Sequence, residues 1–494
     1  MVTSEAVPYA KTGGLADVAG ALPIELARLG HDVRLVLPRY HPSSGDTYAG
    51  FKDWGHLTVP TPAGSLVADI EQGRLQARSS DVSIPVYAVR HDPFFARNGL
   101  YGEKGADYPD NLERFAFLSR TTMELIAALG EGGWAPDILH GHDWQTSLCA
   151  AYRRTLYAGR KSFEHLHTVL TIHNLGYQGV FPAAEYPKTG LSWDLFTPAG
   201  MEFYGSLNLL KGGLVSADLL TTVSPTYAKE IQEPQYGFGL DGVIRERRES
   251  LVGVVNGIDM EVWNPNADPY LAAPYSVSDL KGKQSCKSAL QVELGLPVRD
   301  VPLIGIVSRL TSQKGLDLVA AIFPDLMTLD IQVALLGTGD PASEALFRSF
   351  HLRHPDKLGL LIGFDEGLAH RIEAGADLFL MPSRYEPCGL SQLYSQRYGT
   401  VPVVRRTGGL ADTVVPYGPQ TIRDKQATGF VFDEPAPGAL LTAVLLALRV
   451  YKDRAEWAVL IEAGMRTDVS VAKSARGYEE VYRRAIGQSV RSRG

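Results

Sequence analysis

The chain has 494 residues, of which 45% are hydrophobic and 21% charged, and a formal net charge of −7. This length exceeds one core and predicts two large α/β domains, and the acidic balance argues against a nucleic-acid partner. The three cysteines are too few and scattered for a disulfide framework, so we expect a reducing, cytoplasmic location. No targeting segment is visible. The most apolar stretch, residues 439–450, is too short to cross a bilayer, so no membrane partner is expected.

In the first half, apolar and polar residues alternate as in a chain of strands and helices. Residues 1–3 indicate a short first strand, and 13–30 an amphipathic helix. A long loop is expected over 94–111, where no period is evident. The other elements expected here are strands at 32–37, 84–89, 219–223 and 252–255, hairpins at 47–78, and helices at 112–129 and 206–217.

Two apolar strands of this half, within 137–144 and 168–174, end in His, Asp and Asn residues, among them Asp143 and His173. Polar groups at neighbouring strand ends are typical of a site in an α/β sheet. We expect His140 and His142 to alternate in direction, so that at most one faces a cleft, and His140 to be a core residue. A metal site is not expected, because no ligand set with suitable spacing accompanies them.

An irregular, Pro-rich run from Asn256 to residue 284 predicts the crossover between domains. The second half restarts with a strand at 301–307, followed by Arg309 and Lys314, two cations suited to a diphosphate. The strand at 331–336 leads to Gly337, part of a weak dinucleotide fingerprint. The strand at 358–362 precedes Phe364, whose ring could stack on a base or plug the core. Helices at 439–450 and 475–486 close the chain.

The most informative stretch is 382–391, between an apolar strand at 377–381 and a helix expected to open at Gly389. It places the charged Glu386 in a turn just past the carboxyl end of a strand, where open α/β sheets bind ligands. The helix start offers backbone N–H groups to an anionic or hydroxyl-rich ligand. An ordinary surface glutamate is the alternative.

The six-residue sequence Thr-Gly-Gly-Leu-Ala-Asp occurs twice, at 12–17 and at 407–412, each time after a basic residue and at an expected helix start. Paired glycines there let the backbone approach phosphate oxygens closely. The pairs Gly13-Gly14 and Gly408-Gly409 therefore predict two nucleotide-fold halves that face one cleft. The sequence lacks a Walker lysine motif, the set of protein-kinase motifs and a Gly-x-Ser-x-Gly nucleophile elbow, which disfavours phosphoryl transfer and serine hydrolysis. A sugar nucleotide is therefore the favoured ligand. Arg309 and Lys314 would stabilise its departing diphosphate.

Seven motifs together resemble the bacterial glycogen synthase and plant starch synthase family, over nearly the whole chain: 11–14, 142–144, 171–179, 255–265, 308–315, 383–393 and 406–414. The resemblance implies a glycosyltransferase of the GT-B type, an α/β fold with two Rossmann-like doubly wound domains facing a central cleft. It implies an acceptor-side domain at 1–256, a nucleotide-sugar domain at 257–470, and a last helix at 471–494 that crosses back. The implied activity is glucosyl transfer from ADP-glucose to the non-reducing end of an α-1,4-glucan such as glycogen, with retention and without metal or cofactor.

The resemblance also implies roles for individual residues. Glu386, His173, Arg309, Lys314 and Asp143 match the catalytic group: Glu386 contacts the sugar, His173 lies beside the transferred glucose, and Asp143 is a nearby carboxylate. Lys11 matches a loop lysine on the donor diphosphate, and Phe364 a base-stacking ring that is often Tyr. The remaining donor-binding residues implied are Gly13, Gly14, Asn256, Gly337, Cys388, Gly389, Leu390, Ser391, Thr407, Gly408 and Gly409.

Three departures from the family stand out. The first strand lacks several residues that members carry before Val2, which raises the expectation of a start upstream of Met1. Val471-Ala472 replace a usual Trp-Glu pair, which is expected to loosen the last helix, and Ser391 replaces Thr. The alternatives are a UDP-sugar epimerase, another retaining hexosyltransferase of this fold, or an inactive glucan-binding protein. The motifs leave the donor nucleotide and the oligomeric state open.

Overall fold

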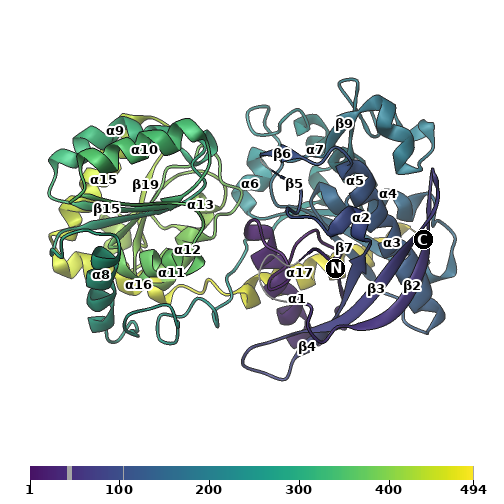
Figure 1. Cartoon of the computed structure of the whole chain (residues 1–494), viewed down its shortest axis with the longest axis horizontal. Helices are drawn as coiled ribbons and strands as arrows, with labels where there is room; N and C mark the ends of the chain where they lie inside the picture. Colours follow the sequence, from purple (N-terminus) through teal and green to yellow (C-terminus); the bar gives the residue numbers. More distant parts are fainter. Residues whose placement is uncertain (42–46, 104, 493–494) are drawn as a thin grey trace. The chain divides into compact units, whose positions relative to one another are not determined.

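A computed structural model describes residues 1–41, 47–103 and 105–492. Contacts divide the chain into two compact units. The N-terminal unit comprises Met1–Asn256 with Val471–Gly494, and the C-terminal unit comprises Gly257–Ser470. Both are α/β, as predicted (Figure 1).

The C-terminal unit is built on one six-stranded parallel sheet in the order β16-β15-β14-β17-β18-β19. This is the doubly wound order, in which the direction of winding reverses at the central strand β14. The strands are β14 Leu303–Val307, β15 Gln332–Gly337, β16 Leu358–Ile362, β17 Leu378–Met381, β18 Val401–Arg405 and β19 Phe430–Phe432. The helices are α8 Lys281–Glu293, α9 Leu316–Thr328, α10 Pro341–Arg353, α11 Glu366–Gly375, α12 Ser391–Arg397, α13 Gly408–Thr413, α14 Pro419–Arg423, α15 Pro437–Tyr451 and α16 Arg454–Arg466.

Both faces of this sheet are buried, because successive side chains of a strand point to opposite sides. Ile304 and Ile306 of β14 pack with α9, α10 and α15 in one apolar cluster. Leu303 of the same strand packs on the other side with residues of α8 and α11. The near-continuous apolar character of 301–307 thus reflects a strand covered on both faces.

The N-terminal unit contains two four-stranded groups, β1-β4-β3-β2 and the parallel group β13-β12-β8-β7. Val2 lies between them and makes single parallel bridges to Val36 of β1 and Gly141 of β7, so the first residues act as a central strand. The strands are β1 Leu35–Pro38, β2 Lys52–Thr61, β3 Gly64–Gln76, β4 Ser83–Arg90, β7 Ile138–His142, β8 His167–Ile172, β12 Leu219–Thr222 and β13 Leu251–Gly253, with short β5 Gly102–Glu103, β6 Ala106–Asp107, β9 Val180–Pro182, β10 Glu202–Phe203 and β11 Ser206–Asn208 outside this sheet.

The last helix of the chain belongs to the N-terminal unit. Tyr478 and Val481 of α17 (Val471–Ser492) share one core with Leu22 of α1 (Gly14–Arg28). Val471 is 5% exposed and belongs to the same core, so this end of the helix packs within the N-terminal unit. The other helices of the unit are α2 Asp92–Phe95, α3 Asn111–Glu131, α4 Leu148–Arg154, α5 Leu209–Ser216, α6 Pro225–Glu230 and α7 Asp241–Glu246.

Three of the expected elements differ from the structure. The helix expected over 206–217 begins only at Leu209, because Ser206–Asn208 pair with β9 and the Asn208 side chain caps the helix. The helix expected at Gly389 begins at Ser391, and Gly389 itself has φ +76, a turn conformation that glycine tolerates. The loop expected over 94–111 contains the small β5–β6 hairpin.

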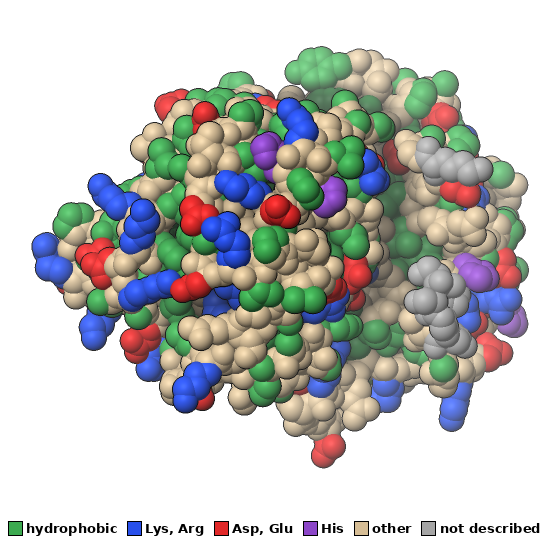
Figure 2. All heavy atoms as spheres, turned by 60° about the vertical axis from the view of Figure 1, so that its left-hand side comes forward, with side chains coloured by type: hydrophobic (Ala, Val, Ile, Leu, Met, Phe, Trp, Pro, Cys, Tyr) green, Lys and Arg blue, Asp and Glu red, His purple; other side chains and the backbone are tan. Residues whose placement is uncertain are grey.

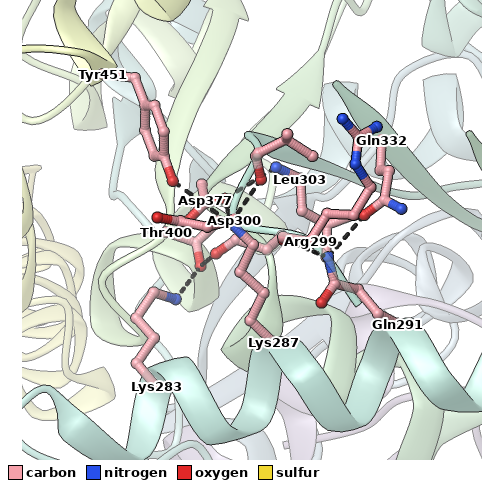
Figure 3. A network of polar contacts seen from close by, with 12 residues as sticks. Lys283, Lys287, Gln291, Arg299, Asp300, Leu303, Gln332, Asp377, Thr400 and Tyr451 are labelled. Carbon is pink, nitrogen blue, oxygen red and sulfur yellow. Dashed lines mark hydrogen bonds and ion pairs between the residues drawn. The ribbon is translucent and has the colours of Figure 1, made fainter. Parts of the chain in front are cut away.

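Helix α8 carries two buried lysines to the edge of the C-terminal sheet at which its strands begin (Figure 3). Lys287 Nζ lies 2.6 Å from Asp377 Oδ2, and the same oxygen accepts the Leu303 N–H. Lys283 Nζ donates instead to the carbonyls of Ala374 and Tyr398 and to Thr400 Oγ1. Burial lowers the pKa of Lys283 to about 8. Burial also lowers that of Lys287, but the Asp377 carboxylate outweighs it and the net pKa is raised.

Acidic and basic side chains are interspersed over the face in Figure 2, without a field of one sign. Across residues 1–41, 47–103 and 105–492, no helix combines the length and apolar character needed to span a bilayer. Cys149, Cys286 and Cys388 are buried, and none of the three is in a disulfide.

Candidate active site

Glu386 is the centre of a buried polar cluster just past the carboxyl end of β17. It is 5% exposed, and its Oε2 lies 2.6 Å from Lys314 Nζ and accepts a 2.8 Å hydrogen bond from Ser383 Oγ. Both contacts involve the same carboxylate oxygen, so Oε1 is the oxygen left for a ligand. The alternative of an ordinary surface glutamate is therefore wrong.

The second glycine pair packs directly against this turn. The Gly409 N–H donates to the carbonyls of Glu386 and Pro387, both at 3.1 Å. A Cβ on Gly408, whose φ is +43, would lie 1.9 Å from the Glu386 carbonyl oxygen, and one on Gly409 would lie 2.2 Å from that of Cys388. The glycines are thus required for this contact, and the Gly409 N–H is already engaged within the protein. Thr407, which precedes α13, is fully buried.

Lys314 and Arg309 come from the connection between β14 and α9, as predicted. Arg309 is exposed and donates to Gln313 Oε1 at 3.1 Å. Gly315 has φ +69, and a Cβ there would lie 2.1 Å from the Pro382 carbonyl oxygen. The Arg384 N–H donates to the Gln313 carbonyl at 2.8 Å. The Lys314 turn and the Glu386 turn are therefore held side by side.

The other residues predicted in this unit line neighbouring turns. Gly337 ends β15, and a Cβ there would lie 2.1 Å from the Ser308 carbonyl oxygen, so the backbones touch. Phe364 follows β16 and is 79% exposed, which excludes a core plug and leaves its ring available for stacking. Cys388, Gly389 and Leu390 form the turn into α12, which begins at Ser391, and Gln392 Nε2 of that helix donates to the carbonyls of Cys388 and Gly389.

In the N-terminal unit, Asp143 and His173 follow β7 and β8 and are brought together. Asp143 Oδ1 accepts the His173 backbone N–H at 2.7 Å. Asp143 has φ 56, unusual for a residue other than glycine. Burial raises the pKa of Asp143 to about 7, opposed by the backbone N–H groups of His173 and Asn174. Burial lowers the pKa of His173 to about 3.

The expectation that His140 and His142 alternate in direction is wrong. Side chains two residues apart on a strand point to the same face, and the two ring centroids are 4.2 Å apart. His140 is a satisfied core residue, as predicted: its ring nitrogens lie 2.7 Å from Tyr482 Oη and 2.6 Å from Thr171 Oγ1. His142 Nδ1 lies 3.0 Å from His173 Nε2. The sequence-based expectation missed this contact because it placed the His142 side chain on the wrong face of the strand.

The first glycine pair is held by a glutamate that sequence reasoning passed over. The Glu5 carboxylate is 3% exposed and accepts the N–H groups of Thr12 at 2.5 Å and Gly13 at 3.3 Å, as well as the Tyr101 hydroxyl. These N–H groups are engaged by protein before any ligand arrives. Gly14 begins α1, and Lys11 Nζ lies 2.7 Å from Asp17 Oδ1. Glu5 follows the first strand, so the rule that placed Glu386 could also have found it.

Asn256 ends the first segment of the N-terminal unit and is 7% exposed, and its buried Oδ1 has no hydrogen-bond partner in the described ranges. A cavity of about 260 Å³ in this unit is lined by Met1, Val33, Trp134, Ile138 and Tyr482, among others. Ile138 begins β7 and Val33 shortly precedes β1, so this cavity is at the edge opposite Asp143 and His173. In the described part of the chain, no group of three or more His, Cys, Asp or Glu side chains could hold a metal ion.

Two families match the chain: starch synthase catalytic domains over residues 1–246 and glycosyl transferases group 1 over residues 295–459. A glycogen synthase of Anaeromyxobacter dehalogenans is 51% identical over 98% of each chain, and one of Syntrophotalea carbinolica is 49% identical over the same shares. The catalytic domain of starch synthase IV from Arabidopsis thaliana, bound to ADP and acarbose, matches with TM-score 0.89 and 34% identity over 98% of both chains. A sucrose-phosphate synthase of Thermosynechococcus elongatus, at TM-score 0.55 and 16% identity over 99% of this chain and 98% of its own, shares the fold. These matches confirm the predicted two-domain glycosyltransferase fold. The chain belongs to the family of bacterial glycogen synthases and plant starch synthases.

Proposed function

We propose that the protein is a glycogen synthase that transfers glucose from ADP-glucose to the non-reducing end of an α-1,4-glucan, with retention of configuration. The observation that carries this proposal is the cluster of Ser383, Glu386 and Lys314 against the Gly408-Gly409 turn. It combines a buried carboxylate, suited to sugar hydroxyls, with a cation suited to a phosphate. The relatives named glycogen synthase at about 50% identity support the same activity.

The proposed reaction breaks the bond between the anomeric carbon and the diphosphate oxygen, and ADP leaves with the electron pair. Arg309 and Lys314 offset the developing negative charge, which is the main catalytic requirement of such a step. The acceptor 4-hydroxyl attacks from the face that ADP leaves, and its proton passes to the departing diphosphate. These proton and electron movements balance without a further reactant, so we propose that no metal or cofactor is needed.

Glu386 is assigned to positioning the glucose and stabilising its positive charge. A covalent nucleophile must approach the anomeric carbon opposite the leaving group. Yet the Glu386 carboxylate forms a salt bridge with Lys314, which is assigned to that leaving group. This placement favours attack within an ion pair over a glucosyl-enzyme. In the N-terminal unit, His173 and Asp143 are assigned to the transferred glucose and Lys11 to the diphosphate.

The test is glucosyl incorporation into glycogen from radiolabelled ADP-glucose and, separately, from UDP-glucose at equal concentration. We expect ADP-glucose to be the better donor. Preference for UDP-glucose would favour another retaining hexosyltransferase of the same fold. Glycogen binding without incorporation from either donor would favour an inactive glucan-binding protein. Lys314→Ala should abolish most incorporation and is the matched control for background labelling.

A further inference from the structure

His142 is buried and contacts His173, although neither the motifs nor the proposed reaction assigns it a task. Its Nδ1 lies 3.0 Å from His173 Nε2, and the two ring centroids are 5.2 Å apart. This is the one hydrogen bond that the His173 ring makes within the described residues, so Nδ1 is the ring nitrogen that remains for a ligand. If His142 supplies the proton of the His142–His173 hydrogen bond, His173 Nδ1 carries a proton and is a donor to that ligand. If His173 supplies it, Nδ1 is an acceptor.

Both imidazoles are neutral at ordinary pH. Burial lowers the pKa of His142 well below its usual value, and burial lowers that of His173 to about 3. A neutral imidazole carries one proton, so one nitrogen donates and the other accepts. The bond between the rings therefore has two possible directions, and each fixes a different tautomer of His173.

The direction follows from the other nitrogen of His142. Its Nε2 is buried and has no hydrogen-bond partner among the residues that the structure describes. If His173 donated, His142 would carry its proton on this nitrogen and bury an unsatisfied N–H, and such groups are rare in proteins. If His142 donates from Nδ1, Nε2 is a bare acceptor, and an unpaired acceptor is better tolerated than an unpaired donor.

The other polar groups nearby do not compete for this proton. Asp143 accepts the backbone N–H of His173 rather than its ring. The His140 ring lies against that of His142 at a tilt, but both His140 nitrogens are engaged, by Tyr482 and by Thr171. The tautomer of His173 is therefore set by His142 alone among the described side chains that contact its ring.

We propose that His142 is a positioning residue that donates from Nδ1 to His173 Nε2 and so keeps the His173 proton on Nδ1, facing the ligand. His173 then acts as a fixed hydrogen-bond donor to an oxygen of the transferred glucose. It cannot take a proton from the acceptor hydroxyl through that nitrogen. This inference rests on the proposed function for the identity of the ligand, but the tautomer itself is a property of the free protein.

The test is the protonation of the His173 ring nitrogens, read by NMR on protein labelled with ¹⁵N-histidine and assigned with a His173→Asn variant. In the unsubstituted protein without ligand, we expect Nδ1 to be protonated and Nε2 bare. A protonated Nε2 would overturn the proposal. This readout needs no activity, so its failure is distinct from failure of the glucosyl-transfer assay.

Variants of His142 test the consequence for catalysis. His142→Leu removes the donor, so we expect a mixture of His173 tautomers and a fall in turnover of about tenfold, as for one lost hydrogen bond. His142→Asn places an amide near the Nδ1 position and should restore Nδ1 protonation and most of the turnover. Tyr482→Phe removes a hydroxyl bound to His140 and is the matched control, with the His173 tautomer unchanged. Single-tautomer signals and full turnover in His142→Leu would refute the proposal.

Discussion

The free energy of unfolding should depend on pH through Lys283, the buried lysine at the edge of the C-terminal sheet where its strands begin. Lys283 has a folded-state pKa of about 8, lowered by burial, against an ordinary value of 10.5. Between these values the folded state binds fewer protons than the unfolded state, so the contribution of Lys283 to stability rises with pH. Below pH 8 Lys283 is charged in the folded state, and burying this charge lowers the free energy of unfolding by the full amount.

The size of the effect follows from the two pKa values. Their difference, at 1.36 kcal/mol per pH unit, corresponds to about 3 kcal/mol. Lys283→Met keeps the apolar stem and removes the titrating group. The free energy of unfolding of the unsubstituted protein, relative to this variant, should therefore increase by about 3 kcal/mol from pH 8 to pH 10.5.

The assay is urea unfolding read by pulse proteolysis, with mass spectrometry of fragments from residues 257–470. Lys287→Met is the matched control from the same helix. Its pKa is raised by Asp377, so the stability it contributes is lost only above the ordinary value. Its difference from the unsubstituted protein should stay constant between pH 8 and pH 10.5. A constant or falling difference for Lys283→Met would refute the reasoning.

Three further predictions concern the site. Glu386→Gln removes the charge paired with Lys314, so turnover should fall about a hundredfold or more. ADP affinity in calorimetry should persist, and a glucosyl adduct on Glu386 in mass spectra of enzyme quenched with a fluorinated donor would instead make it the nucleophile. Phe364→Ala should leave the melting temperature unchanged, because the ring is 79% exposed, and raise the donor KM about tenfold; an unchanged KM would remove it from the base site. Chelation with EDTA should not reduce turnover, and a loss restored by Mg²⁺ would contradict the metal-free proposal.

The fold was predictable where hydrophobic periodicity dominates. The strands of the C-terminal unit are buried on both faces and its helices along one stripe. Their sequences therefore show clear apolar runs for the strands and clear helical periodicity for the helices. The predictions were wrong where the conformation of a few residues is set by tertiary contacts or a turn and not by the local hydrophobic pattern. Ser206–Asn208 continue a helical pattern but pair with β9, and Gly389 precedes a helix but adopts a turn conformation.

The candidate site was predictable to the level of strand ends. Glu386, Lys314, Asp143 and His173 were found because polar residues follow apolar strands. Their partners were not, because contacts such as Glu5 with the Gly13 turn or Gly409 with the Glu386 carbonyl depend on turn geometry. The error over His142 came from a misapplied strand period, which hid a residue in direct contact with His173.

The most direct test of the proposed activity is the linkage formed from ADP-glucose labelled with ¹³C at the anomeric carbon. The protein is incubated with this donor and a short maltooligosaccharide, and the purified product is examined by NMR. We predict that the label appears in a new α-1,4-linked glucose at the non-reducing end, with one ADP released for each glucose transferred. A β linkage would contradict retention. Release of ADP without incorporation, or no reaction with this donor, would contradict glucosyl transfer from ADP-glucose.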